Sequence, residues 1–522
     1  MKLKNTPILA FVLVALSGGL YAFSNVGYGY WPFVFFYLVP LWLALDQLKD
    51  RNWKVVTLAG FIFGFTAFAF GFPWLLTLTD KFLGSGLAVG FFLWCLLGIW
   101  FSLGFALYTL VYRSLLQLGI PQYVAAISPL LVLEWVQPSL FPSFGGAALI
   151  AKPVLAQIAD LGGVLLLSLF VFVVNCAIYS IYRSMSERRS LPIFTIITTS
   201  LLILVVATYG SFKLKILAEE KELAVTNSLN IGAIQSNLVM LPKSEMALKS
   251  HPEYLKQSLD FLSKESVDLL IWPESAYVRG LRRPLPLDAQ FIRGDIKIPI
   301  MFGGTSIWQH EGRKVSANSV FLSDERGLIE QVYDKTMLIP FAEYIPFEAQ
   351  LTSLQETIDN WFPQRQSFYS EGKQQALILN DIPIITPICY EIIFPDLVRE
   401  LINNSKAQVI VTVANDAWFG FSQEPWIHLS FARLRAIEHR RWMVRATNSG
   451  ISAIVDPAGQ IVSQTGLHTQ ETLRGVVYPR TESTFYSRFG NWIGWLSLVT
   501  LLIALFISRG KTYLRESSTE GN

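Results

Sequence analysis

The sequence predicts two fold classes in one chain: an α-helical bundle of membrane-spanning helices and an α/β domain. The 522 residues are 52% hydrophobic and only 16% charged, whereas a soluble domain is usually about a quarter charged. The charges are also unevenly distributed, because residues 1–212 carry 17 of the 81 Asp, Glu, Lys and Arg side chains. This composition excludes an ordinary soluble enzyme and a disordered chain. The net charge of +3 gives no electrostatic reason to expect a nucleic-acid partner.

Eight stretches are long and apolar enough to cross a bilayer, which takes roughly 17–25 residues. Seven precede residue 213, and the eighth lies near the C-terminus. They cover residues 7–24, 29–46, 55–79, 85–111, 119–137, 161–182, 192–212 and Asn491–Ser508. Lys2 and Lys4 before the first stretch are typical of a signal peptide, but six further stretches follow, so we interpret the first as a retained helix.

The basic side chains between these stretches predict the orientation. With the N-terminus inside, the inner segments contain Lys2, Lys4, Lys49, Arg51, Lys54, Arg113, Arg183, Arg188, Arg189, Arg509, Lys511 and Arg515. The short outer loops contain only Lys81 and Lys152. Because cytoplasmic loops are enriched in Lys and Arg, we expect both termini in the cytoplasm and the region between the seventh and eighth spans on the outer side.

Few groups within the spans could carry chemistry. Glu134 and Asp160 lie close to predicted helix ends, where either a hydrogen-bond partner or a proton relay would explain them, and we favour the partner. Cys95 and Cys176 fall in apolar stretches and are expected to be core residues. Cys389 is the only cysteine of the outer region, so no disulfide framework is expected there, and its thiol is either buried or used in chemistry.

From about residue 225 the pattern changes to short apolar runs separated by charged, helical stretches, which is typical of a layered α/β domain. Strands are predicted at Leu229–Gln235, Leu269–Trp272, Ile298–Gly303, Ser319–Leu322, Ile382–Ile388, Val409–Val413 and Ser452–Val455. The clearest predicted helices are Pro252–Ser266 and Ser430–Arg445.

Three reactive side chains lie at boundaries of these apolar runs. Glu274 follows a run in Trp-Pro-Glu-Ser, Lys335 precedes one in Tyr-Asp-Lys, and Cys389 follows one in Cys-Tyr-Glu. Singly, they are more often a turn residue, a solvated lysine and a core cysteine. Reactive groups of α/β sheets gather where strands end in loops, however, so the three together indicate a site.

This trio resembles the Glu–Lys–Cys triad of the nitrilase superfamily, which acts on carbon–nitrogen bonds or transfers acyl groups. Asn415–Gly420 (Asn-Asp-Ala-Trp-Phe-Gly), Arg435–Glu438 and Arg445–Gly450 resemble later motifs of the same superfamily. With eight spans and the outer domain inserted before the last, nearly the whole chain resembles the apolipoprotein N-acyltransferases, a family of bacterial enzymes that complete lipoprotein maturation.

The resemblance implies an eight-span bundle with an α-β-β-α sandwich. Its parts are a seven-span region at 1–212, a periplasmic catalytic domain at 225–480, an eighth helix at 487–508 and a cytoplasmic tail at 509–522. It also implies roles for three residues: Glu274 as proton acceptor, Lys335 as stabiliser of the thiolate and the oxyanion, and Cys389 as nucleophile.

Three further residues fall on the family's supporting positions: Glu343, Tyr390 and Glu391. One departure is Ser244 after Lys243, where the family often has a tryptophan, and this leaves the role of that aromatic ring open.

The reaction implied by the resemblance is a ping-pong acyl transfer in the bacterial inner membrane. Cys389 would take an acyl chain from a phospholipid, for which we expect phosphatidylethanolamine. The thioester would then pass the chain to the α-amine of a diacylglyceryl-cysteine at the N-terminus of a lipoprotein. No cofactor is expected, since the sequence has no phosphate-binding glycine loop, and the five histidines show no metal-binding spacing. We expect a monomer.

Aromatic side chains near the triad suggest a lid over the acyl chains. The candidates are Trp361 and Phe362, within Leu351–Tyr369, and Trp418 and Phe419. Such side chains suit the membrane interface, and excluding water would protect a thioester. Ordinary packing between domain and membrane explains the same residues equally well.

Three alternatives remain open from the sequence. A membrane-tethered amidase of the nitrilase type would use the same triad with water as acceptor, although one helix would be enough to tether it. A transporter with an outer binding domain would not need the thiol. A lipoprotein-binding scaffold would form no covalent acyl intermediate.

Overall fold

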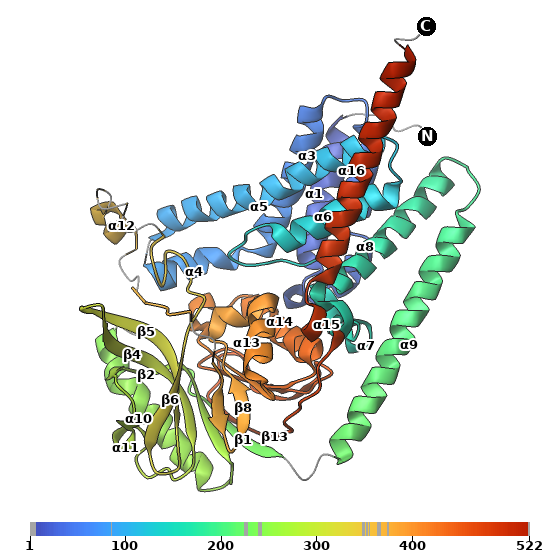
Figure 1. Ribbon diagram of the computed structural model, residues 1–522. Helices are drawn as coiled ribbons and strands as arrows, with labels where there is room; N and C mark the ends of the chain where they lie inside the picture. The colour runs from blue at the N-terminus through green and yellow to red at the C-terminus, as the bar shows by residue number, and fades with distance from the viewer. Residues whose placement is uncertain are drawn as a thin grey trace. The chain divides into compact units, whose positions relative to one another are not determined.

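The computed structural model describes residues 7–84, 86–223, 228–238, 243–346, 350, 353, 355–362, 367–372 and 375–519. For residues 82–83, 221–223, 243–247, 355 and 508–519 it describes the backbone alone. The chain divides into two compact units (Figure 1). The helical unit comprises Met1–Pro73, Phe92–Phe212 and Arg488–Asn522, and the α/β unit comprises Trp74–Phe91 and Lys213–Ser487.

The helical unit consists mainly of apolar helices, which range from four to 32 residues. They are α1 (Pro7–Phe23), α2 (Val39–Gln47), α3 (Trp53–Gly71), α5 (Gly86–Gln117), α6 (Gln122–Val136), α7 (Pro153–Ala156), α8 (Ala159–Ser186), α9 (Ile193–Leu223) and α16 (Trp492–Thr519). Among the described residues, four segments are long and apolar enough to span a membrane: those in α3, α5, α8 and α9. Pro7–Phe23, Gln122–Val136 and Trp492–Ile507 are apolar but shorter. The described residues therefore support a membrane protein, with four helices that are clearly long and apolar enough to span a bilayer.

The second predicted span, residues 29–46, is not one helix. It forms a 3₁₀ turn at Trp31–Phe35, a break, and the nine-residue helix α2. Pro32 and Pro40 lack the N–H that would continue a helix. Asn175 of α8 satisfies the freed backbone groups, because its side chain accepts from the Leu38 N–H at 3.0 Å and donates to the Val34 carbonyl at 2.8 Å. Broken helices are tolerated at membrane depth where such partners exist.

The third predicted span, residues 55–79, is also two helices. The helix α3 ends at Gly71, and α4 (Trp74–Leu83) begins after Pro73. A proline disfavours the helical conformation of the residue before it, which explains the break. α4 packs on the 3₁₀ turn η7 (Asp416–Phe419) and belongs to the α/β unit.

Small residues bring α1, α3 and α5 close together. A side chain on Gly60 or Gly64 would collide with the backbone of α5, and one on Gly18 would come within 2.5 Å of the Phe63 carbonyl oxygen of α3. This is the close packing that a Gly-x-x-x-Gly pattern allows. The acids of this unit have partners, since Glu134 accepts from the Gly145 N–H at 2.7 Å and Asp160 from the Tyr209 hydroxyl at 2.8 Å.

The α/β unit contains two facing sheets. The seven-stranded sheet has the order β13-β1-β2-β4-β5-β6-β3, and the six-stranded sheet has the order β12-β11-β10-β9-β8-β7. The strands are β1 Leu229–Gln235, β2 Leu269–Arg282, β3 Leu287–Asp288, β4 Ile300–His310, β5 Arg313–Ser323, β6 Leu328–Asp334, β7 Leu377–Leu379, β8 Ile382–Ile385, β9 Val409–Ala414, β10 Trp442–Thr447, β11 Ala453–Val455, β12 Ile461–Gln464 and β13 Glu471–Val477.

Helices cover the outer faces of both sheets (Figure 1). The first sheet is covered by α10 (Lys243–Leu262) and α11 (Gln290–Arg293), and the second by α13 (Pro395–Ser405) and α14 (Glu424–His439). β1 and β2 face β9 and β10 across the interior. The predicted α-β-β-α sandwich is therefore confirmed. Ser244 lies in α10, among the residues described by backbone alone.

The central strands form where the sequence is apolar. β1 has the predicted bounds, and all six residues of β9 and of β10 are buried. Strands buried on both faces read as continuous apolar runs. The predicted helix Ser430–Arg445 is wrong at its end: α14 stops at His439, Arg440 adopts a left-handed conformation with φ of 52°, and β10 follows. The left-handed residue ends the helix as a C-cap.

Candidate active site

Glu274 lies at an irregularity of β2. The pairing of β2 with β4 loses its register between Trp272 and Tyr277, and Ser275 has φ of +58°. Such a bulge re-aims a side chain. Gly303 of β4 makes room for it, because a side chain there would come within 2.6 Å of the Glu274 Cα.

Lys335 follows β6, with its N–H donating to the Asn318 carbonyl at 2.8 Å. The side chain is 1% exposed, and its ammonium donates to Oε1 of Glu343 at 2.8 Å. Burial lowers the pKa of this ammonium, but the charges of Glu343 and Glu274 outweigh burial and hold it above its ordinary value. Lys335 is therefore a fixed positive charge in the site.

Asn318 of β5 connects the two glutamates of the site. Its side-chain N–H₂ donates to Oε1 of Glu274 at 2.8 Å and to Oε1 of Glu343 at 3.3 Å. Oε2 of Glu343 accepts from the Ile339 N–H at 2.9 Å, so both its oxygens are held. Asn318 was not predicted as a site residue, because it lies just before the predicted strand Ser319–Leu322, whereas β5 extends back to Arg313.

Cys389 is the first residue of the 3₁₀ turn η6 (Cys389–Ile393) and has φ of +51°. It follows β8, and Ile388 pairs with Val413 of β9. A left-handed conformation at a residue other than glycine is uncommon and clusters at functional sites. The thiol is buried and hydrogen-bonds with the side chain of Glu274 and with the main-chain N–H of Asn415.

The protonation of this pair is set by burial. Burial and the charge of Glu274 raise the pKa of the Cys389 thiol well above its ordinary value, and the charge of Lys335 opposes them. Burial also raises the pKa of Glu274, with Lys335 again opposing. Neighbouring anions at this site are thus disfavoured. The arrangement suits a neutral thiol that transfers its proton to a carboxylate when it attacks, rather than a resting thiolate.

Glu391 joins the loop of the nucleophile to the loop of the lysine. One carboxylate oxygen accepts from the N–H and hydroxyl of Thr336 at 2.7 and 2.9 Å and from the Met337 N–H at 2.9 Å. The other accepts from the Ile388 N–H at 2.7 Å and the Tyr333 hydroxyl at 3.0 Å. The side chain is fully buried, so it is placed to fix the loops rather than to meet a substrate.

The remaining predicted residues differ in exposure. Tyr390 is buried, with its ring edge-on to Phe394 at 4.8 Å. Phe362 is 4% exposed and Phe419 6%, the latter packed on Trp74 of α4 at 5.4 Å.

Two lid candidates keep exposed surface. Trp361, at the end of α12 (Gln355–Trp361), is 39% exposed, and Trp418 is half-buried. Phe421 nearby is 93% exposed. Of the aromatic side chains in these loops, Phe362 and Phe419 are therefore buried, whereas Trp361, Trp418 and Phe421 keep exposed surface.

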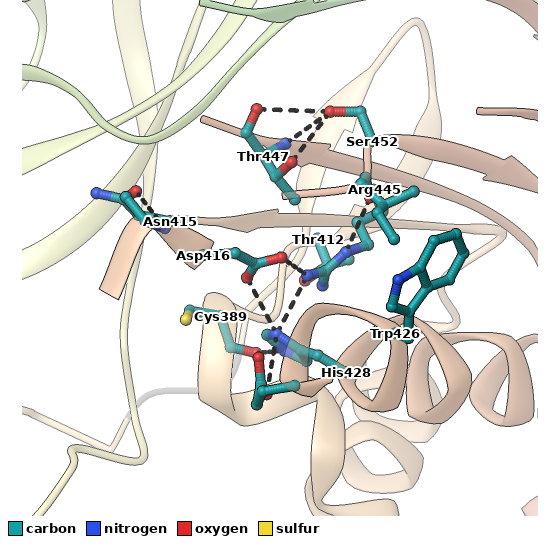
Figure 2. A network of polar contacts seen from close by, with 12 residues as sticks. Cys389, Thr412, Asn415, Asp416, Trp426, His428, Arg445, Thr447 and Ser452 are labelled. Carbon is teal, nitrogen blue, oxygen red and sulfur yellow. Dashed lines mark hydrogen bonds and ion pairs between the residues drawn. The ribbon is translucent and has the colours of Figure 1, made fainter. Parts of the chain in front are cut away.

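A second buried polar group lies beside the cysteine (Figure 2). Carboxylate and imidazole atoms of Asp416, Glu424 and His428 come within 4.8 Å of one another, the spacing of a metal site. Arg445, however, places its guanidinium 2.5 Å from Oδ2 of Asp416 and 3.1 Å from Nδ1 of His428. The arginine already supplies the positive charge that a metal ion would bring, so this group does not fit a metal.

Residues 245–478, the segment that contains Glu274, Lys335 and Cys389, match the model of the carbon–nitrogen hydrolase family. Residues 17–177 match the N-terminal domain of apolipoprotein N-acyltransferases. Together the two matched segments make the chain similar to the apolipoprotein N-acyltransferases over most of its length.

Similar proteins share nearly their full length with this chain. The apolipoprotein N-acyltransferase of Rhodopseudomonas palustris is 29% identical over 540 residues, covering 95% of each chain. That of Haemophilus influenzae is 29% identical over 513 residues, covering 94% of each. That of Pasteurella multocida is 29% identical over 531 residues, covering 97% of each.

Proposed function

We propose that this chain transfers an acyl chain from a phospholipid, through a thioester on Cys389, to the α-amine of the diacylglyceryl-cysteine at the N-terminus of lipoproteins. The observation that carries the proposal is the meeting of a thiol, a carboxylate and an ammonium in one buried site. These three groups are a complete set for acyl transfer by covalent catalysis.

In the first half-reaction, Glu274 takes the proton of the Cys389 thiol as the sulfur attacks the ester carbonyl of the phospholipid. Lys335 stabilises the negative charge that develops on the carbonyl oxygen. The ester C–O bond then breaks, and Glu274 returns the proton to the departing oxygen. The products are a thioester and a lysophospholipid.

In the second half-reaction, the α-amine of the lipoprotein attacks the thioester and Glu274 takes a proton from the amine. The C–S bond breaks, the amide forms, and the proton returns to the sulfur. Neither step needs ATP, because both the ester and the thioester are activated acyl groups. Glu343 and Asn318 hold Lys335 and Glu274, and Glu391 and Tyr390 hold the surrounding loops.

The setting we propose is the bacterial inner membrane, with eight membrane segments, cytoplasmic termini and a periplasmic α/β unit. The four clear spans, the shorter apolar helices and the distribution of basic residues support it. The donor we propose is phosphatidylethanolamine, and the chain acts as a monomer.

The decisive experiment is mass spectrometry of the full-length chain incubated with phospholipid in detergent micelles. We expect an acyl mass on the peptide that contains Cys389, discharged by a diacylated lipopeptide. An acylated lipopeptide without any adduct on Cys389 would refute the thioester.

The second candidate function is a membrane-tethered amidase, favoured by the match of residues 245–478 to carbon–nitrogen hydrolases. It predicts that the acyl-enzyme turns over equally fast in water without a lipopeptide. Strict dependence on the amine acceptor would exclude it.

A further inference from the structure

The main chain of the nucleophile is held by a residue outside the Glu–Lys–Cys set. His428 of α14 places Nε2 3.0 Å from the carbonyl oxygen of Cys389. Asp416 of η7 and Arg445 of β10 complete a network with it, as Figure 2 shows. His428 is 2% exposed, and Asp416 and Arg445 are fully buried.

The partners of His428 define one tautomer. Burial and the charge of Arg445 lower its pKa, so the ring is neutral at pH 7. Nε2 faces a carbonyl oxygen at 3.0 Å, which can only accept. Nδ1 lies between the Arg445 guanidinium at 3.1 Å, which can only donate, and Oδ1 of Asp416 at 3.3 Å, which can only accept. A neutral ring has one N–H, and the acceptor at Nε2 requires it there, while the lone pair of Nδ1 accepts from Arg445. The proton is therefore on Nε2, and the ring donates to Cys389.

The same network holds the segment on the other side of the sulfur. Asp416 follows Asn415, whose main-chain N–H hydrogen-bonds with Cys389. The Asp416 carboxylate is fixed by Arg445 at 2.5 Å, and a side chain on Gly450 would come within 2.0 Å of that carboxylate. One arginine thus orients both the imidazole that binds the Cys389 carbonyl and the loop that binds its thiol.

We propose that His428 is a positioning residue for acyl transfer. This proposal rests on the proposed function, in which Cys389 is the nucleophile. Its hydrogen bond maintains the left-handed conformation of Cys389 (φ +51°). That conformation keeps the sulfur next to the Glu274 carboxylate and the Asn415 N–H. His428 itself meets neither substrate nor reacting atom, and acts only through the peptide of the nucleophile.

Two substitutions of equal length separate positioning from packing. His428→Gln keeps an N–H₂ that can reach the Cys389 carbonyl and an oxygen that can accept from Arg445, whereas His428→Met keeps only bulk. We expect the single-turnover rate of Cys389 acylation by phospholipid to stay within about threefold of the parent for His428→Gln. For His428→Met we expect a loss of about 10- to 100-fold, since small misplacements of a reacting group have effects of this size. The KM for phospholipid should change less than twofold in both.

His439→Met is the control for His428→Met. It also replaces a buried histidine of α14 by methionine, but at a position that does not contact Cys389. His439 is fully buried and hydrogen-bonds with the Ser487 hydroxyl at 2.8 Å. We expect a fall in Tm with the acylation rate within twofold of the parent. Equal acylation rates in His428→Gln and His428→Met, or a loss in His428→Met that appears only in KM, would overturn the proposal. Absence of any adduct in the parent chain would instead refute the proposed function.

Discussion

At the residue scale, the chemistry depends on one sulfur and its base. Cys389 and Glu274 are buried together; burial raises the pKa of both groups, and the charge of Glu274 raises that of the thiol further. Cys389→Ser and Cys389→Ala should therefore abolish acyl transfer almost completely while the chain still folds, because both replacements are small. Acylation of a lipopeptide, measured by mass spectrometry, and Tm check this. Full acylation of the lipopeptide by Cys389→Ala would show that this thiol is not the nucleophile.

The raised pKa of Glu274 predicts the pH dependence of acylation. The carboxylate form is the base, so the rate should fall as the pH drops through the raised pKa, which lies above the ordinary value of about 4.3. Lys335→Met removes a positive charge that lowers the pKa of Glu274. In this variant the fall in acylation rate on the acidic side of the pH profile should therefore occur at higher pH. The maximum rate should also fall, because the oxyanion loses its stabilising charge. The pH profile of single-turnover acylation measures both. An unchanged limb in Lys335→Met would show that another group limits the rate.

At the element scale, the bulge of β2 places Glu274 only because β4 has a glycine opposite. Gly303→Ala would put a Cβ within 2.6 Å of the Glu274 Cα, so β2 must shift. We expect acylation to fall by about 10-fold or more, since a shift of about 1 Å has such an effect. Gly19→Ala, where a Cβ meets nothing within 4 Å, is the control. Full activity in Gly303→Ala would mean that the bulge does not aim the carboxylate.

The loops that carry exposed aromatic rings are predicted to act as a lid over the acyl chains. Trp418 is half-buried next to the anchored Phe419, and Phe421 is 93% exposed. If these rings exclude water from the thioester, then Trp418→Ala should raise the ratio of lipid hydrolysis to acyl transfer. The two products can be separated by mass. A ratio that stays constant would leave only a packing role for this side chain.

Whole elements were predictable where local pattern and burial agree. β1 and the apolar parts of α5, α8 and α9 could be predicted because each is a continuous run of mainly apolar residues. Pro32 and Pro73 indicate breaks in the second and third predicted spans. Hydropathy averaged over a whole span does not detect such breaks. The strand β10 was missed because Arg440 and Arg441 precede it and continue a charged pattern, although both arginines are buried.

The site was predictable in part. Glu274, Lys335 and Cys389 stood out because each lies at the boundary of an apolar run, although β2 continues past Glu274 to Arg282. Asn318 and His428 did not, because an amide in a strand and a histidine on a helix are common in sequences. Only tertiary structure brings them against Glu274 and the Cys389 carbonyl.

At the scale of the whole molecule, the α/β unit is not one continuous segment. Residues 74–91 belong to it, and Trp74 covers Phe419 with ring centroids 5.4 Å apart. A fragment of residues 213–487 should therefore expose this aromatic surface, aggregate more readily and bind a hydrophobic dye, unlike the full chain in detergent. Light scattering and dye fluorescence test this. A soluble, monomeric fragment with native acylation would show that α4 is dispensable.

The position of α4 also has a consequence for biogenesis. The ribosome makes α4 among the first helices, long before the strands that it packs against. The helix must therefore wait without its partner until η7 and the rest of the α/β unit have been made. Folding of that unit is then completed only when its late strands and helices capture a helix that was synthesised long before them.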